Sequence, residues 1–126
     1  MKKLLLIALL FVSFTNYAQK ETFTKTYKSY NTKEDGVIME LQRTDLLVVF
    51  NEKNTGYICL YYQDGKTIKY KPYGNVEKVE TTDGDKTQLI KAIDVSSGDE
   101  VLIQLFDESE MLRIIIAQGW LIEFYK

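Results

Sequence analysis

Histidine is absent from this chain of 126 residues. Without an imidazole, neither a Ser-His-Asp nor a Cys-His arrangement can form, and the usual imidazole ligands of zinc are missing as well. A carboxylate pair could still serve a glycosidase, but most acidic residues fall in predicted turns, where they are solvated. We therefore expect no catalytic residue, no metal ion and no cofactor.

Cysteine and proline are almost absent, with Cys59 and Pro72 as their sole representatives. A single cysteine cannot form an intramolecular disulfide, so the fold must be stabilised by its apolar core. Because no histidine is available to activate its thiol, we expect Cys59 to be a small buried hydrophobe on a strand.

No apolar run is long enough to cross a bilayer as a helix, which takes about 20 residues. The longest run, Leu4 to Phe14, follows Lys2 and Lys3 and precedes a small residue, Ala18. This order of a charged start, an apolar stretch and a small residue is typical of a secretory signal peptide. A buried N-terminal helix is the alternative, but it leaves the charged start and the small-residue end unexplained.

We accordingly predict a cleavable signal peptide over residues 1–18 and a single domain over residues 19–126, which is the usual size for one domain. The protein would be exported, to the periplasm or beyond the cell, and would not be a transmembrane protein. Loss of the leader removes two of the sixteen basic residues and leaves a net charge of −4 against eighteen acidic ones. An acidic chain is poorly suited to nucleic acid.

Short runs of β-branched and aromatic residues, separated by turn signals, make up the rest of the chain. This spacing predicts an all-β fold, an antiparallel meander of about eight strands that forms either a sandwich or a small, partly closed barrel. The turn signals are Asp35-Gly36, Asn54 to Gly56, Asp64-Gly65, Gly74-Asn75, Asp83-Gly84, Ser97-Gly98, Asp107 to Glu110 and Gln118-Gly119.

The last four predicted strands can be aligned, because loop length fixes register and a slip of one residue reverses every side chain. Loops of three, four and three residues bring eleven apolar side chains and Lys91 onto one face, which we predict to be the core. Its rows are Val95, Val101, Ile116 and Trp120; Ile93, Ile103, Ile114 and Ile122; and Lys91, Leu105, Leu112 and Phe124.

The opposite face carries a predicted polar ladder in which Arg113 lies between Gln104 and Glu123. Apolar residues flank this ladder, among them Phe106, Met111 and Tyr125. A face left to water should be mostly polar, so we expect this one to be covered. The cover could be a second sheet of a sandwich, a partner protein or second copy, or a ligand cavity in which Arg113 meets an anionic or polar molecule.

Tyrosine is plentiful, with nine in the chain. A two-residue turn at Asp64-Gly65 would place Tyr61 and Tyr70 on one face of a hairpin, where their rings could stack on a glycan. Tyrosine is also simply a good strand former, which is the more ordinary explanation. The nearby Lys69 and Lys71, with Pro72, are typical of an edge strand protected against pairing.

The Asp83-Gly84-Asp85 turn lacks the ligand series of a calcium loop and predicts a plain hairpin that sets Val79 opposite Leu89. The sequence as a whole favours an exported, non-enzymatic binding or interaction protein of the bacterial cell envelope, with a protein partner or self-association through an apolar sheet face. One alternative is a small-molecule carrier that uses the interior of a β-barrel. A carboxylate-dependent glycan hydrolase is the least favoured alternative.

Overall fold

The computed structural model describes residues 21–117 and 119–126, so the predicted signal peptide lies outside the described residues. Every strand pairing in this part of the chain is antiparallel. One short 3-10 turn, η1 (Glu52–Asn54), interrupts the strands. The strands are β1 (Phe23–Glu34), β2 (Val37–Ile38), β3 (Gln42–Phe50), β4 (Ile58–Tyr62), β5 (Thr67–Glu80), β6 (Lys86–Asp94), β7 (Glu100–Phe106), β8 (Leu112–Ala117) and β9 (Trp120–Tyr125).

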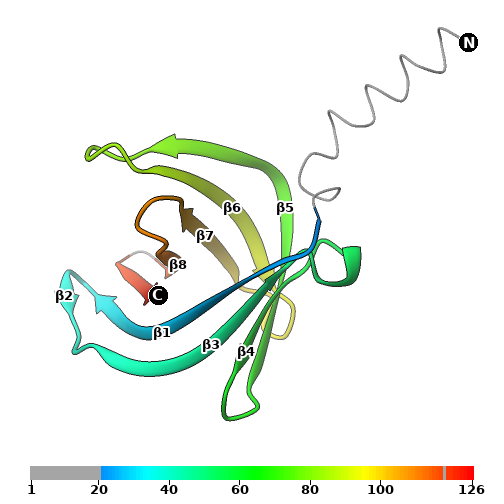
Figure 1. Ribbon diagram of the computed structural model, residues 1–126, viewed down its shortest axis with the longest axis horizontal. Helices are drawn as coiled ribbons and strands as arrows, with labels where there is room; N and C mark the ends of the chain where they lie inside the picture. Colours follow the sequence, from blue (N-terminus) through cyan, green and yellow to red (C-terminus); the bar gives the residue numbers. More distant parts are fainter. Residues whose placement is uncertain (1–20, 118) are drawn as a thin grey trace, which may run out of the picture.

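Strand β1 closes the sheet into a barrel of eight strands, with β2 as one additional strand. The first part of β1 pairs with β3, a register shift follows between Tyr27 and Ser29, and residues 29–34 pair with β9. In Figure 1, β5 and β6 arch over one side of the barrel, and β1 and β3 form the opposite side. The prediction of an antiparallel meander is confirmed in its barrel form, and the second sheet of a sandwich is not formed.

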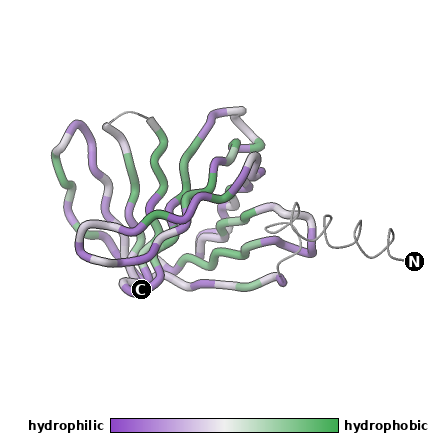
Figure 2. The backbone as a smooth tube through the Cα atoms, turned by 90° about the horizontal axis from the view of Figure 1, so that it is seen from above, coloured by the Kyte–Doolittle hydropathy of each residue, from purple (hydrophilic) through white to green (hydrophobic). Residues whose placement is uncertain are grey.

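The inner face of the barrel is filled by apolar side chains from all eight strands. Ile90, Ile103, Ile114 and Ile122 are paired in sequence across β6, β7, β8 and β9 and form one row of the core. Burying one such side chain contributes about 1.5–3 kcal/mol. Figure 2 shows hydrophobic residues recurring along the strands and hydrophilic residues at the turns. The barrel is therefore a packed core rather than a hollow tube over most of its height.

The predicted register is confirmed for β7, β8 and β9 over their central residues. Leu105, Leu112 and Phe124 are paired in one row, and Gln104, Arg113 and Glu123 in the next. The end of the hairpin differs from the prediction, because a register shift pairs Trp120 with the residue after Ile116. Trp120 is 42% exposed, so the prediction that it belongs to the core is wrong.

The predicted register of β6 is wrong by three residues, because Ile103 lies opposite Ile90 rather than Ile93. The loop is longer than expected because Asp94 starts it: its carboxylate accepts hydrogen bonds from the backbone and hydroxyl of Ser96. A shift by an odd number reverses the faces of β6. Lys91 is exposed and Val95 lies outside the core, where Ile90 and Ala92 take their places.

The hairpin of β4 and β5 also differs from its prediction. The backbone N–H of Tyr62 donates to the carbonyl of Lys66, so three residues turn the chain instead of two. This single-residue slip puts Tyr70 on the buried inner face and Tyr61 on the outer face, so the predicted shared tyrosine face does not exist. The edge-strand prediction is wrong for Lys69, which lies opposite Cys59 of β4. It is confirmed for Lys71 and Pro72, because β4 pairs with β5 only up to Tyr70 and these two residues pair with β6 alone.

The β5–β6 hairpin is a plain one, but with Val79 opposite Thr87 instead of Leu89. Its loop is closed by a hydrogen bond from the Thr81 N–H to the Asp85 carbonyl. Within residues 21–117 and 119–126, no group of three or more potential ligands is placed to hold a metal ion. Cys59 is fully buried, as predicted.

Candidate functional site

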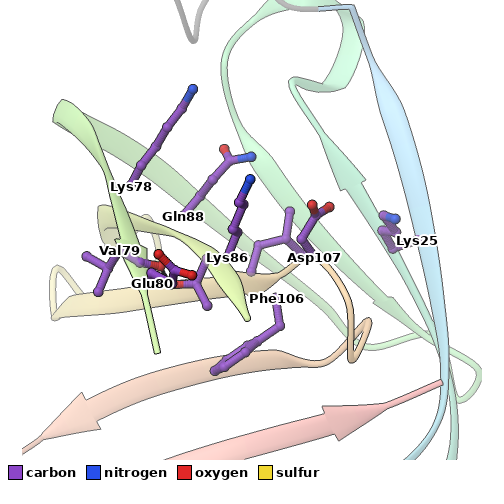
Figure 3. A pocket seen from close by; sticks show the side chains of 10 residues that line it. Lys25, Lys78, Val79, Glu80, Lys86, Gln88, Phe106 and Asp107 are labelled. Atoms are coloured by element: carbon purple, nitrogen blue, oxygen red, sulfur yellow. Dashed lines mark hydrogen bonds between the residues drawn. The ribbon is translucent and has the colours of Figure 1, made fainter. Parts of the chain in front are cut away.

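A cleft of about 410 Å³ lies at the end of the barrel that carries the β5–β6 and β7–β8 loops. Figure 3 shows the side chains that surround it. They come from four strands and the start of one loop: Lys25 of β1; Lys78, Val79 and Glu80 of β5; Lys86, Thr87 and Gln88 of β6; and Leu105, Phe106 and Asp107 of β7 and the loop after it. We refer to this feature as the lysine cleft.

Three lysines line the lysine cleft from two sides. Lys25 stands on β1, across the opening from Lys78 and Lys86 on β5 and β6 (Figure 3). Glu80 lies opposite Lys86 in the ladder. None of these three lysines has a carboxylate within ion-pair distance among the described residues. Their charges are therefore available to a ligand.

The floor of the lysine cleft is formed where the barrel core begins. Gln88 and Leu105 are paired on the inner face, and the next inner row, Ile90 and Ile103, is almost completely buried. A ligand could thus rest on Leu105 but not pass through the barrel. The cleft combines an apolar floor with a charged rim, which suits a small amphipathic molecule.

The β7–β8 loop at the rim is fixed by Asp85. The carboxylate of this residue accepts hydrogen bonds from the backbone N–H groups of Glu108, at 2.9 Å, and Ser109, at 3.2 Å. These bonds, led by the one from Glu108, lower the pKa of Asp85. A third bond, from the Asp107 N–H to the Lys86 carbonyl, ties the loop to β6. The rim is therefore held in place before any ligand arrives.

Tyr27 lies two residues after Lys25 on the same inner face of β1. Its side chain is 1% exposed, and its hydroxyl has no hydrogen-bond partner among the described residues. Burial, and secondarily the charge of Glu110, raise the pKa of this phenol. A buried hydroxyl without a hydrogen bond lowers the stability of the folded state by about 1–3 kcal/mol relative to a bonded one.

The predicted polar ladder forms on the outer surface of the barrel. Arg113 donates from Nε and Nη2 to Oε2 of Glu123, at 3.0 and 2.8 Å, and from Nη1 to Oε1 of Gln104, at 3.1 Å. The guanidinium also lies 5.0 Å from the centre of the Phe106 ring. All three nitrogens of the Arg113 guanidinium thus donate hydrogen bonds within the protein, and the Phe106 ring lies beside the group.

The ladder extends into a hydrogen-bonded chain across six strands. On one side, Gln104 donates to the Thr87 hydroxyl, which donates to the Val79 carbonyl. On the other side, the Tyr125 hydroxyl lies 3.2 Å from Oδ1 of Asn31 on β1. The chain crosses the seam between β9 and β1, so its clearest physical role is to fasten the closed barrel and fix its register.

The structure brings six of the eight predicted contact residues together and separates two. Gln104, Phe106, Arg113, Glu123 and Tyr125 share the outer face, and the backbone carbonyl of Met111 accepts from Phe106 beside them. Tyr61 lies elsewhere, with its hydroxyl bonded to Glu52, and Tyr70 is inside the barrel.

Sequence reasoning missed the lysine cleft. Its residues lie up to 82 positions apart in the sequence, from Lys25 to Asp107, and no local spacing links Lys25 to Lys86 or Asp107. One sequence signal could have indicated the cleft: Lys78 and Lys86 lie on either side of the β5–β6 turn, at one end of the barrel. That signal becomes informative only once the inner face of each strand is known.

The fold and the cleft define a small closed β-barrel with one charged, open end. In comparisons with protein-family models, curated proteins and solved structures, no significant match to this chain was found. No helix in the described part of the chain is long and apolar enough to cross a membrane. The geometry of the barrel and its cleft is therefore the basis for assigning a function.

Proposed function

We propose that this protein is an exported, non-enzymatic binding protein that holds a small amphipathic anion in the lysine cleft. The observation that carries the proposal is that three lysines, none of them in an ion pair within the described residues, line a cleft of about 410 Å³ from two sides. Ligand sites of small molecules typically occupy about 300–1,000 Å³ and combine apolar walls with a few charged anchors. The proposal is a form of the small-molecule carrier alternative, with the ligand bound at the end of the barrel rather than in its interior.

Charge supports an anion over a cation as the ligand. The chain carries a formal net charge of −2, yet the cleft gathers three lysines against two carboxylates, those of Glu80 and Asp107. The cleft therefore has an excess of one positive charge, and an excess charge in a concave site raises the local concentration of ligands of the opposite sign. The apolar part of the ligand would rest on Leu105.

Hydrolysis remains the less favoured function. Glu80 and Asp107 both line the cleft, and a glycosidase uses two carboxyl groups. Both are exposed to solvent, and neither lies in an apolar pocket of the kind that keeps a general acid protonated.

The proposal is tested by calorimetric titration with decanoate and with anilinonaphthalene sulfonate, two amphipathic anions. Lys25→Gln and Lys86→Gln should each weaken binding about tenfold, because a charge-assisted hydrogen bond contributes about 1.5–3 kcal/mol. Lys53→Gln is the matched control, since Lys53 lies in η1, outside the cleft. Equal affinities of all three variants and the wild type, or no binding of either anion, would refute the proposal.

A further inference from the structure

Four exposed apolar side chains lie close together in the sequence, on β2 and the link that follows it. Val37 is 62% exposed, Ile38 64%, Met39 47% and Leu41 59%. Single exposed apolar residues are ordinary, but a contiguous group of this kind usually marks an interaction site.

These residues lie on a stretch of sheet edge that has no partner. Among the described residues, β2 pairs only with β1, and β4 pairs with β3 only over Leu46 to Phe50. Residues 37–45 are therefore without a ladder partner on one side, and we call them the free edge. A hollow of about 660 Å³ lies beside the free edge, lined by Leu41 to Asp45 and by Lys28, Ser29 and Gln63.

The barrel has two further unpaired edges among the described residues, and both are protected. From Lys71 to Glu80, β5 pairs only with β6, and this segment carries Pro72 and two lysines, Lys71 and Lys78. The first part of β1 has no partner on the side away from β3, because pairing with β9 begins only at Ser29. That segment carries Lys25 and Lys28, and edge lysines discourage strand pairing. The free edge carries four apolar residues instead, so it is the one suited to pairing.

We infer that two copies of this chain associate through the free edge, with residues 37–45 of each copy running antiparallel to each other. Unpaired backbone N–H and C=O groups are best satisfied by another extended backbone, and the apolar side chains beside them become buried in the same step. An antiparallel pair of identical edges is self-complementary and consumes both edges, so assembly stops at a two-fold dimer.

The charges of the free edge fit this arrangement. Glu40 and Arg43 form no ion pair within the described residues. Because the copies run in opposite directions, Glu40 of each copy can face Arg43 of the other, which gives two symmetric ion pairs. The lysine cleft is lined by different residues, so the dimer does not depend on ligand binding.

Light scattering of the purified protein after size exclusion tests the inference. The expected mass is twice that of one chain, and Ile38→Lys combined with Leu41→Lys should reduce it to that of a monomer. Val95→Lys is the matched control, because Val95 is 54% exposed but belongs to the β6–β7 loop, outside the free edge, and should leave the dimer intact. A monomeric wild type would overturn the inference, even if the edge then accepts a foreign peptide.

A charge exchange tests the arrangement without altering apolar surface. Glu40→Arg and Arg43→Glu should each weaken the dimer several-fold, and the double variant should restore it. Circular dichroism would confirm that each variant is folded. A double variant as weak as the two single variants would rule out the antiparallel pairing of these two residues.

Discussion

Arg113 on β8 and Glu123 on β9 form an ion pair in which two guanidinium nitrogens, Nε and Nη2, donate to the same carboxylate oxygen, Oε2. The two residues are directly opposite in the ladder. Their side chains are 30% and 17% exposed, so the pair is partly shielded from water. Such a pair contributes more than a surface salt bridge and is costly to break on one side only.

We predict that Arg113→Leu lowers the free energy of unfolding by about 2 kcal/mol, because Glu123 and Gln104 lose their common partner. Arg113→Leu combined with Glu123→Leu should recover most of this loss, since no unpaired charge is left. Urea denaturation measures the free energy of unfolding of both variants and of the wild type. Lys28→Ala, which breaks an exposed ion pair with Asp45, should cost at most about 1 kcal/mol. Additive losses in the double variant would contradict the coupled ladder.

We predict that the buried hydroxyl of Tyr27 does not stabilise the protein. Tyr27→Phe removes a group that has no partner among the described residues, so the free energy of unfolding should stay unchanged or rise. Tyr125→Phe removes a hydroxyl bonded to Asn31 and should cost about 1 kcal/mol. Thermal and urea unfolding of the two variants, compared side by side, measure the difference. A larger loss for Tyr27→Phe would show that its hydroxyl is bonded in solution.

The protein should lose stability at alkaline pH. Burial raises the pKa of Tyr62 to about 12 and also raises that of Tyr70, whereas an unfolded tyrosine has a pKa of about 10. Up to about pH 9 both phenols are protonated in the folded and in the unfolded protein, so their contribution to the free energy of unfolding does not change with pH. Above about pH 10 only the unfolded state ionises, so each such phenol lowers the free energy of unfolding by about 1.4 kcal/mol per pH unit.

Urea midpoints measured at a series of pH values, together with the phenolate absorbance of the native protein, test this dependence. Part of the tyrosine absorbance should appear only as the protein unfolds. A native titration in which all tyrosines ionise near pH 10 would be inconsistent with the buried inner face.

Cys59 should be inert in the folded protein. It is fully buried, and burial together with Glu52 raises its pKa to about 11, so almost no thiolate is present at neutral pH. Ellman's reagent should react with no thiol in the native state and with one thiol per chain in urea. Fast labelling of the native protein would show that the β3–β4 loop opens readily above Cys59.

Local chemistry determined much of the fold. The alternation around Ile103, Ile114 and Ile122 requires one face to be apolar, and two tight loops connect the three strands, so their register could be derived. The placement of Arg113 between Gln104 and Glu123 followed from the same alignment and is confirmed. The burial of Cys59 was predicted because a lone cysteine on a strand is most often a small buried hydrophobe, and it is confirmed.

Local chemistry failed where a side chain changed the length of a loop. Asp94 binds Ser96 and starts its loop early, and the Asp64 turn contains one residue more than a two-residue hairpin. Each change shifts a strand by an odd number of residues and exchanges its inner and outer faces. Tyr61 and Tyr70 were separated for this reason.

The sequence by itself determined that this is an antiparallel β protein with a strongly patterned C-terminal half, because alternation and turn chemistry act between near neighbours. Only the tertiary structure decided that β1 joins β9 to close a barrel, that Lys25 faces Lys86 across its opening, and that residues 37–45 are left without a partner. These relationships join residues distant in sequence, and they are set by the curvature and closure of the whole sheet, which no local pattern encodes.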